Sequence, residues 1–149
     1  MIMVFKFRLQ KVLEYREKQK KLAQEALVLS RLELREIEDE LARLEQEEDK
    51  LFQFERDNQG LALEPLTLFS IENYRHYLQE NYQNGLQARA EQEKKVEKKR
   101  FAVVERWKDC QILEKLKENA HDDFRQEEKV REQYLNDEIS LYGYLRKEK

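Results

Sequence analysis

The stretch DNQGLALEPLTLFS, residues 57–70, holds the only proline of the chain and one of its three glycines. Gly60 can end a helix in the left-handed conformation, and Pro65 disfavours helical backbone at the residue before it. Ser70 fits the N-cap of a second helix, with Thr67 as a second candidate. The stretch therefore predicts a chain reversal: a helix over about 5–57, a loop over about 58–69 and a helix over about 70–146.

Before this stretch, apolar residues recur in alternating steps of four and three. From Leu27 to Leu51 the repeat reads Leu, Ser, Leu, Ile, Leu, Leu, Glu, Leu, and Arg16 and Lys20 weaken it nearer the N-terminus. A repeat of 3.5 residues keeps one seam of a helix against a partner helix, as in a left-handed coiled coil.

After the stretch, the apolar residues shift phase more than once, which predicts local unwinding of the coiled coil. Gly85 marks a weak or closely packed point of the second helix. A turn near residue 63 pairs residues whose numbers add to about 126, so Leu44 lies near Tyr82 and the second helix outruns the first by roughly 25 residues. The expected fold is all-α: one domain over residues 1–149, an antiparallel two-helix coiled-coil hairpin whose second helix is longer.

The composition favours long helices and a cytoplasmic protein. Charged residues make up 41% of the 149 residues, yet the net charge is only −3 and both signs are interleaved. This mixture lacks the one-sided positive field of non-specific nucleic-acid binding. Residues 1–5 are too short for a signal-peptide core, and no apolar run is long enough to cross a bilayer. Cys110 is the only cysteine, so no disulfide can form within the chain.

No catalytic, cofactor-binding or metal-binding residue is expected. The two histidines, His76 and His121, are far apart in sequence, and Glu118 with His121 supplies one Glu-x-x-His pair where di-iron bundles need two pairs and two further Glu. Cys110 falls on the apolar seam, where it is expected to be a small buried hydrophobe. Residues 94–100 are rich in Lys and Arg but interleaved with Glu, so a solvated face is favoured over an RNA-binding arm.

Two surfaces are candidates for binding other proteins. The first is the turn, around which six aromatic residues gather, more than a two-helix seam can enclose. They either anchor a partner or pack the loop back on the hairpin. The second is formed by the apolar N-terminal residues and the overhang of the second helix, which a partner or a second copy of the chain would cover. The six aromatic residues are Phe52, Phe54, Phe69, Tyr74, Tyr77 and Tyr82.

The opening sequence FKFRLQKVLEYRE, residues 5–17, resembles that of the flagellar FliJ family, the small coiled-coil component of the flagellar type III export apparatus. Residues 113–118, LEKLKE, are similar to the Leu-Glu-x-Leu-Lys stretch of that family, and residues 137–139, DEI, to its closing Asp-Glu element.

This resemblance implies a non-enzymatic stalk that binds and stimulates the hexameric export ATPase, reaches the cytoplasmic domain of the membrane export gate and meets export chaperones. It places the protein at the inner face of the cell membrane, with roles in flagellum biogenesis, motility and chemotaxis. The alternatives are the stalk of a virulence type III system and a generic coiled-coil adaptor or self-associating scaffold. By resemblance, the ATPase-binding end comprises Phe5, Phe7, Arg8, Leu9, Leu13, Arg16, Asp137 and Glu138, and the gate-facing candidates are Tyr74, Tyr77 and Leu78.

Overall fold

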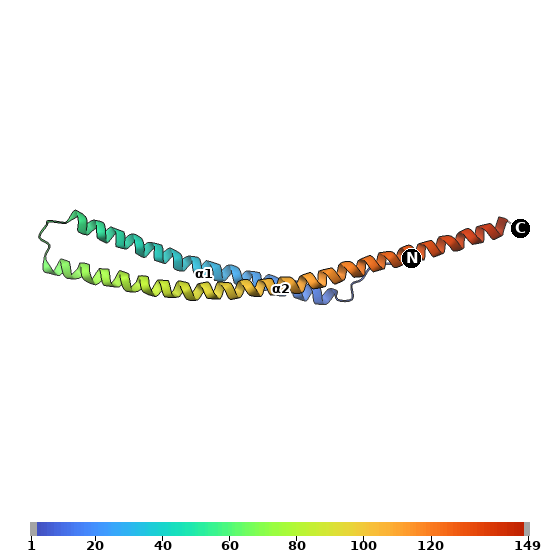
Figure 1. Cartoon of the computed structure of the whole chain (residues 1–149), viewed down its shortest axis with the longest axis horizontal. Coiled ribbons are helices and arrows are strands. Elements are labelled where there is room, and N and C mark those ends of the chain that lie inside the picture. The colour runs from blue at the N-terminus through green and yellow to red at the C-terminus, as the bar shows by residue number, and fades with distance from the viewer. Residues whose placement is uncertain (1–2, 148–149) are drawn as a thin grey trace. The chain divides into compact units, whose positions relative to one another are not determined.

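Two helices dominate the computed structural model, which describes residues 3–147. Helix α1 spans Gln10–Asp57 and helix α2 spans Pro65–Lys147, and the short loop between them reverses the chain (Figure 1). No strand occurs within the described range. The expected antiparallel hairpin with a longer second helix is confirmed.

The loop is shorter than expected because α2 begins at Pro65 and not near Ser70. Proline suits the first position of a helix, since its fixed φ is already helical and the amide hydrogen it lacks would have no partner there. The Ser70 hydroxyl donates to the carbonyl oxygen of Leu66 at 3.0 Å, so Ser70 lies inside α2 and is not its N-cap. Gly60 has the positive φ, 94°, that was expected at the end of the first helix.

Helix α1 begins at Gln10, five residues later than expected, and residues 3–9 precede it without regular structure. The Gln10 amide donates to the carbonyl oxygen of Phe7 at 3.2 Å, and the Leu13 amide to that of Leu9 at 2.9 Å, so the first turn forms here. The apolar pattern of Phe5, Phe7 and Leu9 therefore belongs to a segment that leads into the helix.

The contacts within the chain fall into two units, and both helices pass through both. One unit comprises residues 1–21 and 104–149, and the other comprises residues 22–103 with the loop. The single domain expected over the whole chain stays a prediction.

The seam of α1 is confirmed. Leu13, Leu27, Ser30, Leu41 and Leu44 are buried. The other seam positions are half-buried with one exception, Glu48, which is exposed while its neighbour Glu47 is half-buried. The four-three repeat therefore identified the helix face that meets α2. The remaining seam residues of the expected pattern are Leu9, Arg16, Lys20, Ala23, Leu34, Ile37 and Leu51.

The phase shifts expected in α2 are wrong. Buried and half-buried residues recur in steps of four and three from Ile71 to Val96 and from Arg106 to Phe124. Several of them are polar, with stems that can pack while their heads reach water. An apolar-only pattern skips them and selects exposed neighbours such as Trp107 and Leu116 instead. The positions are Ile71, Arg75, Leu78, Tyr82, Gly85, Arg89, Gln92 and Val96 in one unit, and Arg106, Cys110, Leu113, Lys117, Ala120 and Phe124 in the other.

The expected pairing register is confirmed in both units. In residues 22–103 the Tyr82 hydroxyl donates to Glu45 at 2.8 Å, one residue from the expected pairing with Leu44. In the other unit Arg16 of α1 forms an ion pair with Asp109 of α2 at 3.6 Å, and the numbers of these residues add to 125. The two helices therefore pair in the register that a turn near residue 63 sets.

One polar layer interrupts the apolar seam of residues 22–103. The Gln92 amide donates to the carbonyl oxygen of Ser30 at 3.0 Å, to its hydroxyl at 3.2 Å and to a carboxylate oxygen of Glu33 at 3.1 Å. Gln92 and Ser30 are both buried. A buried polar group is stable only where its partners are in reach, so this layer favours one register over its neighbours.

Candidate docking surfaces

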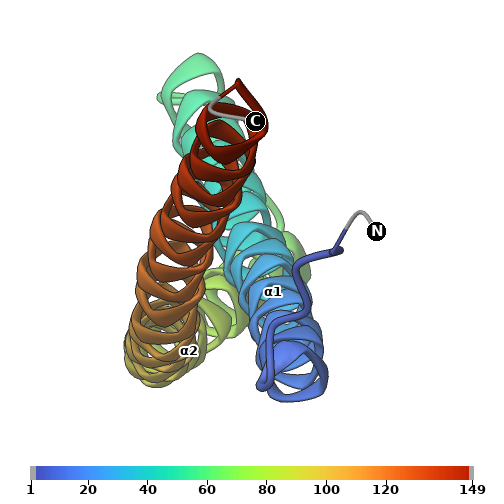
Figure 2. The same cartoon turned by 90° about the vertical axis from the view of Figure 1, so that its right-hand side faces the viewer.

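The segment ahead of α1 packs on the side of α2. The ring of Phe5 meets His121 edge-on and lies 5.5 Å from the ring of Phe124, and a guanidinium nitrogen of Arg131 contacts the sulfur of Met3. In Figures 1 and 2 this segment is the dark blue stretch that leads to α1. Residues 3–9 and the part of α2 after residue 117 thus form one surface.

A groove opens beside the first turn of α1. Two aromatic residues and four cations line it, together with one acid, and the first turn itself contains no acidic residue. The sequence pattern had marked its aromatic residues and Arg8, with Lys11 beside them, but not Lys6 or Lys117. Charge counted by segment would have found Lys6, because residues 1–21 hold seven Lys and Arg against two Glu. The groove is lined by Phe5, Lys6, Phe7, Arg8, Gln10, Lys11, Glu14 and Lys117.

The residues expected at the ATPase-binding end all lie in this unit but are not equally accessible. Leu13 is 3% exposed and packs in the seam between the helices, so it cannot contact a partner directly. Arg16 is half-buried and forms an ion pair with Asp109 of α2 at 3.6 Å. Phe5, Phe7 and Leu9 are half-buried, whereas Arg8, Asp137 and Glu138 are exposed.

The last turns of α2 have no helix beside them. Every residue from 129 to 147 is exposed, and Figure 1 shows the red end of α2 without a helix alongside it. The expected overhang is therefore present, and it exposes a large apolar area for a partner to cover. Its exposed apolar residues are Val130, Tyr134, Leu135, Ile139, Leu141, Tyr142, Tyr144 and Leu145.

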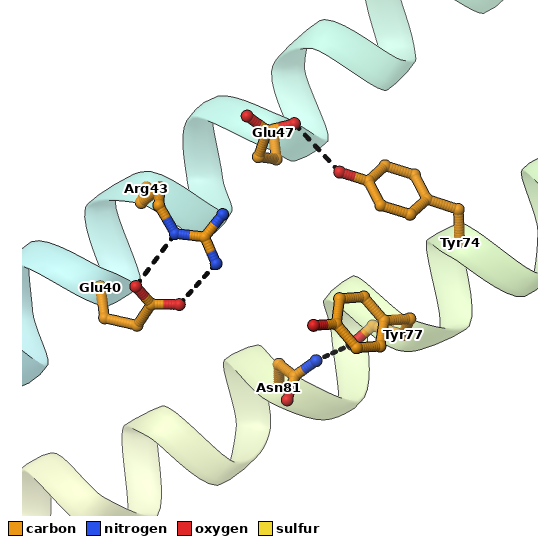
Figure 3. Close-up of polar contacts among 6 residues, drawn as sticks. All are labelled: Glu40, Arg43, Glu47, Tyr74, Tyr77 and Asn81. Carbon is orange, nitrogen blue, oxygen red and sulfur yellow. Dashed lines mark hydrogen bonds and ion pairs between the residues drawn. The ribbon is translucent and has the colours of Figure 1, made fainter.

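The second surface lies near the loop, where Tyr74 and Tyr77 stand out from α2. Their rings stack at a centroid distance of 6.3 Å and an angle of 17°. Tyr77 is 57% exposed, and the Asn81 amide donates to its carbonyl oxygen (Figure 3). Leu78 is buried in the seam, so of the three gate-facing candidates only the tyrosines reach solvent.

One charged residue of α1, Glu47, is bonded to the tyrosine pair, and an ion pair within α1 lies nearby. The Tyr74 hydroxyl donates to Glu47 at 3.0 Å, and Arg43 donates two hydrogen bonds to Glu40 one turn away (Figure 3). The hydrogen bond from Tyr74, with help from Lys50, lowers the pKa of Glu47, and the same bond raises the pKa of Tyr74. These α1 residues were missed in the sequence because a cross-helix pair becomes visible only once the register is known.

Most of the aromatic residues near the loop are exposed, as a two-helix seam requires. Phe52, Phe54 and Phe69 have more than two fifths of their surface exposed, whereas Tyr82 is half-buried through its bond to Glu45. The loop therefore does not bury them by packing back on the hairpin.

The described residues offer little for chemistry. No group of three His, Cys, Asp or Glu side chains between residues 3 and 147 is arranged to hold a metal ion. Cys110 is 1% exposed, as expected for a seam residue, and burial raises the pKa of its thiol, which disfavours the reactive thiolate. His121 packs against Phe5, and its Nδ1 accepts a hydrogen bond from Arg125 at 3.3 Å.

Neither helix, over the residues described, has a stretch apolar and long enough to cross a membrane.

A helical hairpin with exposed aromatic and charged surfaces defines a protein of the coiled-coil, partner-binding class. Residues 5–149 match the sequence profile of the family described as Flagellar FliJ protein, and the chain belongs to that family. It is therefore a non-enzymatic component of flagellar type III protein export. No curated protein and no solved structure matches the chain.

Proposed function

We propose that this chain binds the hexameric export ATPase through its terminal end, stimulates it, and links it to the cytoplasmic domain of the membrane export gate. The observation that carries the proposal is the family match over residues 5–149. The exposed overhang and the groove support it, because both are suited to contact a partner and belong to one unit. The chain would then act at the inner face of the cell membrane, where export chaperones also meet it.

Stimulation would arise from unequal binding. An asymmetric hairpin cannot make the same contacts with every subunit of a symmetric ring, so it favours some subunit conformations over others. Such differential binding changes nucleotide turnover or ring assembly without any chemistry performed by the hairpin.

The direct test measures ATP hydrolysis and oligomerisation of the purified export ATPase with and without this chain. We expect the chain to raise the rate, the fraction of hexamer, or both. An unchanged rate together with an unchanged oligomeric state would refute the proposal. In that case a stable dimer in light scattering would favour the self-associating scaffold.

Replacing Phe7 and Leu9 by Asp should abolish stimulation while helicity in circular dichroism is kept, because both residues precede α1. A matched control replaces the exposed Leu61 and Leu66 at the loop by Asp, which adds the same charge far along the sequence from the terminal residues. Full stimulation by the Phe7/Leu9 variant would exclude this end as the ATPase contact.

For the export gate, the exposed Tyr74 and Tyr77 are the candidate contacts, since aromatic residues on a helix are common anchors at interfaces. Tyr77→Ala should weaken binding of the purified gate domain by about tenfold or more, as loss of a hot spot does. Phe101→Ala removes another exposed aromatic of α2 and serves as the control. Equal losses in both variants would argue against a specific role for the tyrosine pair.

A further inference from the structure

The groove beside the first turn of α1 gathers four cations against one acid, Glu14. None of Lys6, Arg8, Lys11 and Lys117 forms an ion pair within residues 3–147. Ion pairs are frequent elsewhere along both helices, for example between Arg16 and Asp109 in the same unit. Four like charges around one groove repel one another, and an anionic ligand would relieve this repulsion.

The groove also has an apolar side. Phe5 and Phe7 contribute to its lining, and contacts with His121 and Phe124 fix the ring of Phe5. Arg8 is exposed and can offer its guanidinium fork to a carboxylate in a bidentate pair. This combination fits a peptide segment that carries an apolar side chain between acidic residues.

The positive charge is local, which disfavours a long polyanion. On the facing part of α2, residues 104–121, four Lys and Arg are balanced by four Asp and Glu. A nucleic acid or an anionic membrane gains affinity from cations spread over an extended surface, which this balanced part of α2 does not provide. The balanced residues are Arg106, Lys108, Lys115 and Lys117 against Glu105, Asp109, Glu114 and Glu118.

We infer that this groove binds an acidic segment of the export ATPase, one that places carboxylates on the four cations and an apolar side chain against Phe5 and Phe7. The identity of the partner rests on the proposed function, whereas the chemistry of the segment follows from the groove. Attraction between the two surfaces would speed association and orient the chain against the ring subunit.

The test reverses the charge of the groove in the full chain by combining Lys6→Glu, Arg8→Glu and Lys11→Glu. We expect the affinity for the purified ATPase to fall at least about tenfold and its dependence on salt to become shallower, because charge pairs are lost. The matched control combines Lys94→Glu, Lys95→Glu and Lys98→Glu, three exposed residues without ion pairs to the described residues, and has the same net charge. Its affinity should equal that of the unaltered chain.

Carbodiimide cross-linking, which joins a lysine amine to a carboxylate in contact with it, locates the segment directly. We expect cross-links from Lys11 and Lys117 to Asp or Glu of the ATPase. If the charge-reversed variant still binds the ATPase and these cross-links do not form, the inference that the groove binds an acidic segment is wrong. The proposed function is then left intact. Absence of any binding by the unaltered chain overturns both.

Single-stranded RNA and phosphatidylglycerol vesicles are the probes for the other anions. At physiological salt, we expect neither the RNA nor the vesicles to bind the unaltered chain more tightly than they bind the Lys6/Arg8/Lys11 variant. If charge reversal abolishes binding of either probe and leaves ATPase binding unchanged, the groove is a phosphate site and the inference is wrong.

Discussion

A single missing side chain sets the closest approach between α1 and α2 in residues 22–103. A Cβ atom added at Gly85 would lie 2.6 Å from Cδ2 of Leu41, whose side chain is 4% exposed. Buried Leu41 has little room to move away, so a larger residue at position 85 would force its neighbours to shift. Of the two readings of Gly85 that the sequence allowed, a closely packed point is therefore the right one.

Gly85→Ala should lower the free energy of unfolding by about 1–3 kcal/mol, because the clash outweighs the usual gain in helix propensity. Gly143→Ala is the control, since a Cβ at that exposed position of α2 meets nothing within 4 Å. Urea unfolding should show a stability equal to or above that of the unaltered chain for Gly143→Ala. A stabilised Gly85→Ala variant would contradict the close packing.

The buried Gln92 is expected to specify register more than stability. Gln92→Leu combined with Ser30→Ala makes the layer apolar and should raise the melting temperature, since buried polar groups often stabilise less than apolar ones of similar size. Distances between spin labels placed on the two helices should at the same time broaden into more than one register. A single sharp distance in this double variant would show that the layer does not select the register.

At the scale of the element, the link between Glu47 on α1 and Tyr74 on α2 depends on pH. The pKa of Glu47 is lowered in the folded chain, chiefly by the Tyr74 hydrogen bond. A carboxyl whose folded pKa is depressed contributes stability above its unfolded pKa, near 4.3, and this contribution is lost as pH falls through the folded value. The two helices should therefore be joined less tightly here in acid.

Tyr74→Phe removes the hydroxyl and should raise the pKa of Glu47 toward its ordinary value, measured by carbon-13 NMR of the carboxyl group. Lys50 still lowers the pKa in this variant, so the return should be partial. Glu40, whose pKa is lowered mainly by Arg43, is the internal control and should titrate as before. An unchanged Glu47 titration would mean that the hydroxyl does not reach it in solution.

The elements also show where sequence reasoning succeeds. The seam of α1 was predictable because leucine fills most of its positions, and the register followed from the single breaker cluster at Gly60 and Pro65. The seam of α2 was not, because Arg75, Arg89 and Gln92 pack among apolar residues and a hydrophobicity pattern skips them. Pro65 was read as a barrier before a helix, although it opens one.

For the candidate surfaces, the sequence identified residue types but not accessibility. Phe5, Phe7 and Arg8 were found from the opening pattern, and the structure brings Lys117 to them from more than a hundred positions later. Leu13 and Leu78 were named as site residues by resemblance to the family but are buried. Only the pairing of the helices decides which face of each helix solvent reaches.

At the scale of the whole molecule, the overhang of α2 should matter for binding and little for folding. A chain ending at Glu128 lacks only residues that are exposed in the described part of the helix. Its melting temperature should stay within a few degrees of that of the full chain, because exposed side chains contribute little to stability. Its stimulation of the export ATPase should fall, since the exposed apolar residues and Asp137 with Glu138 are gone.

Calorimetry and the hydrolysis assay check both expectations on the same samples. A chain ending after Leu141, which keeps Asp137, Glu138 and much of the apolar surface, is the graded control. A large drop in melting temperature for the shorter chain would mean that the overhang packs against something in solution.

The short loop between Asp57 and Pro65 also constrains how such a chain can change length over evolutionary time. The two helices run antiparallel. An insertion in one helix therefore shifts every facing pair beyond it, unless the other helix gains the same number of residues at the facing position. Additions of seven keep each seam in phase. The hairpin can therefore lengthen or shorten most readily by paired heptads, and relatives of different size should differ by such matched steps.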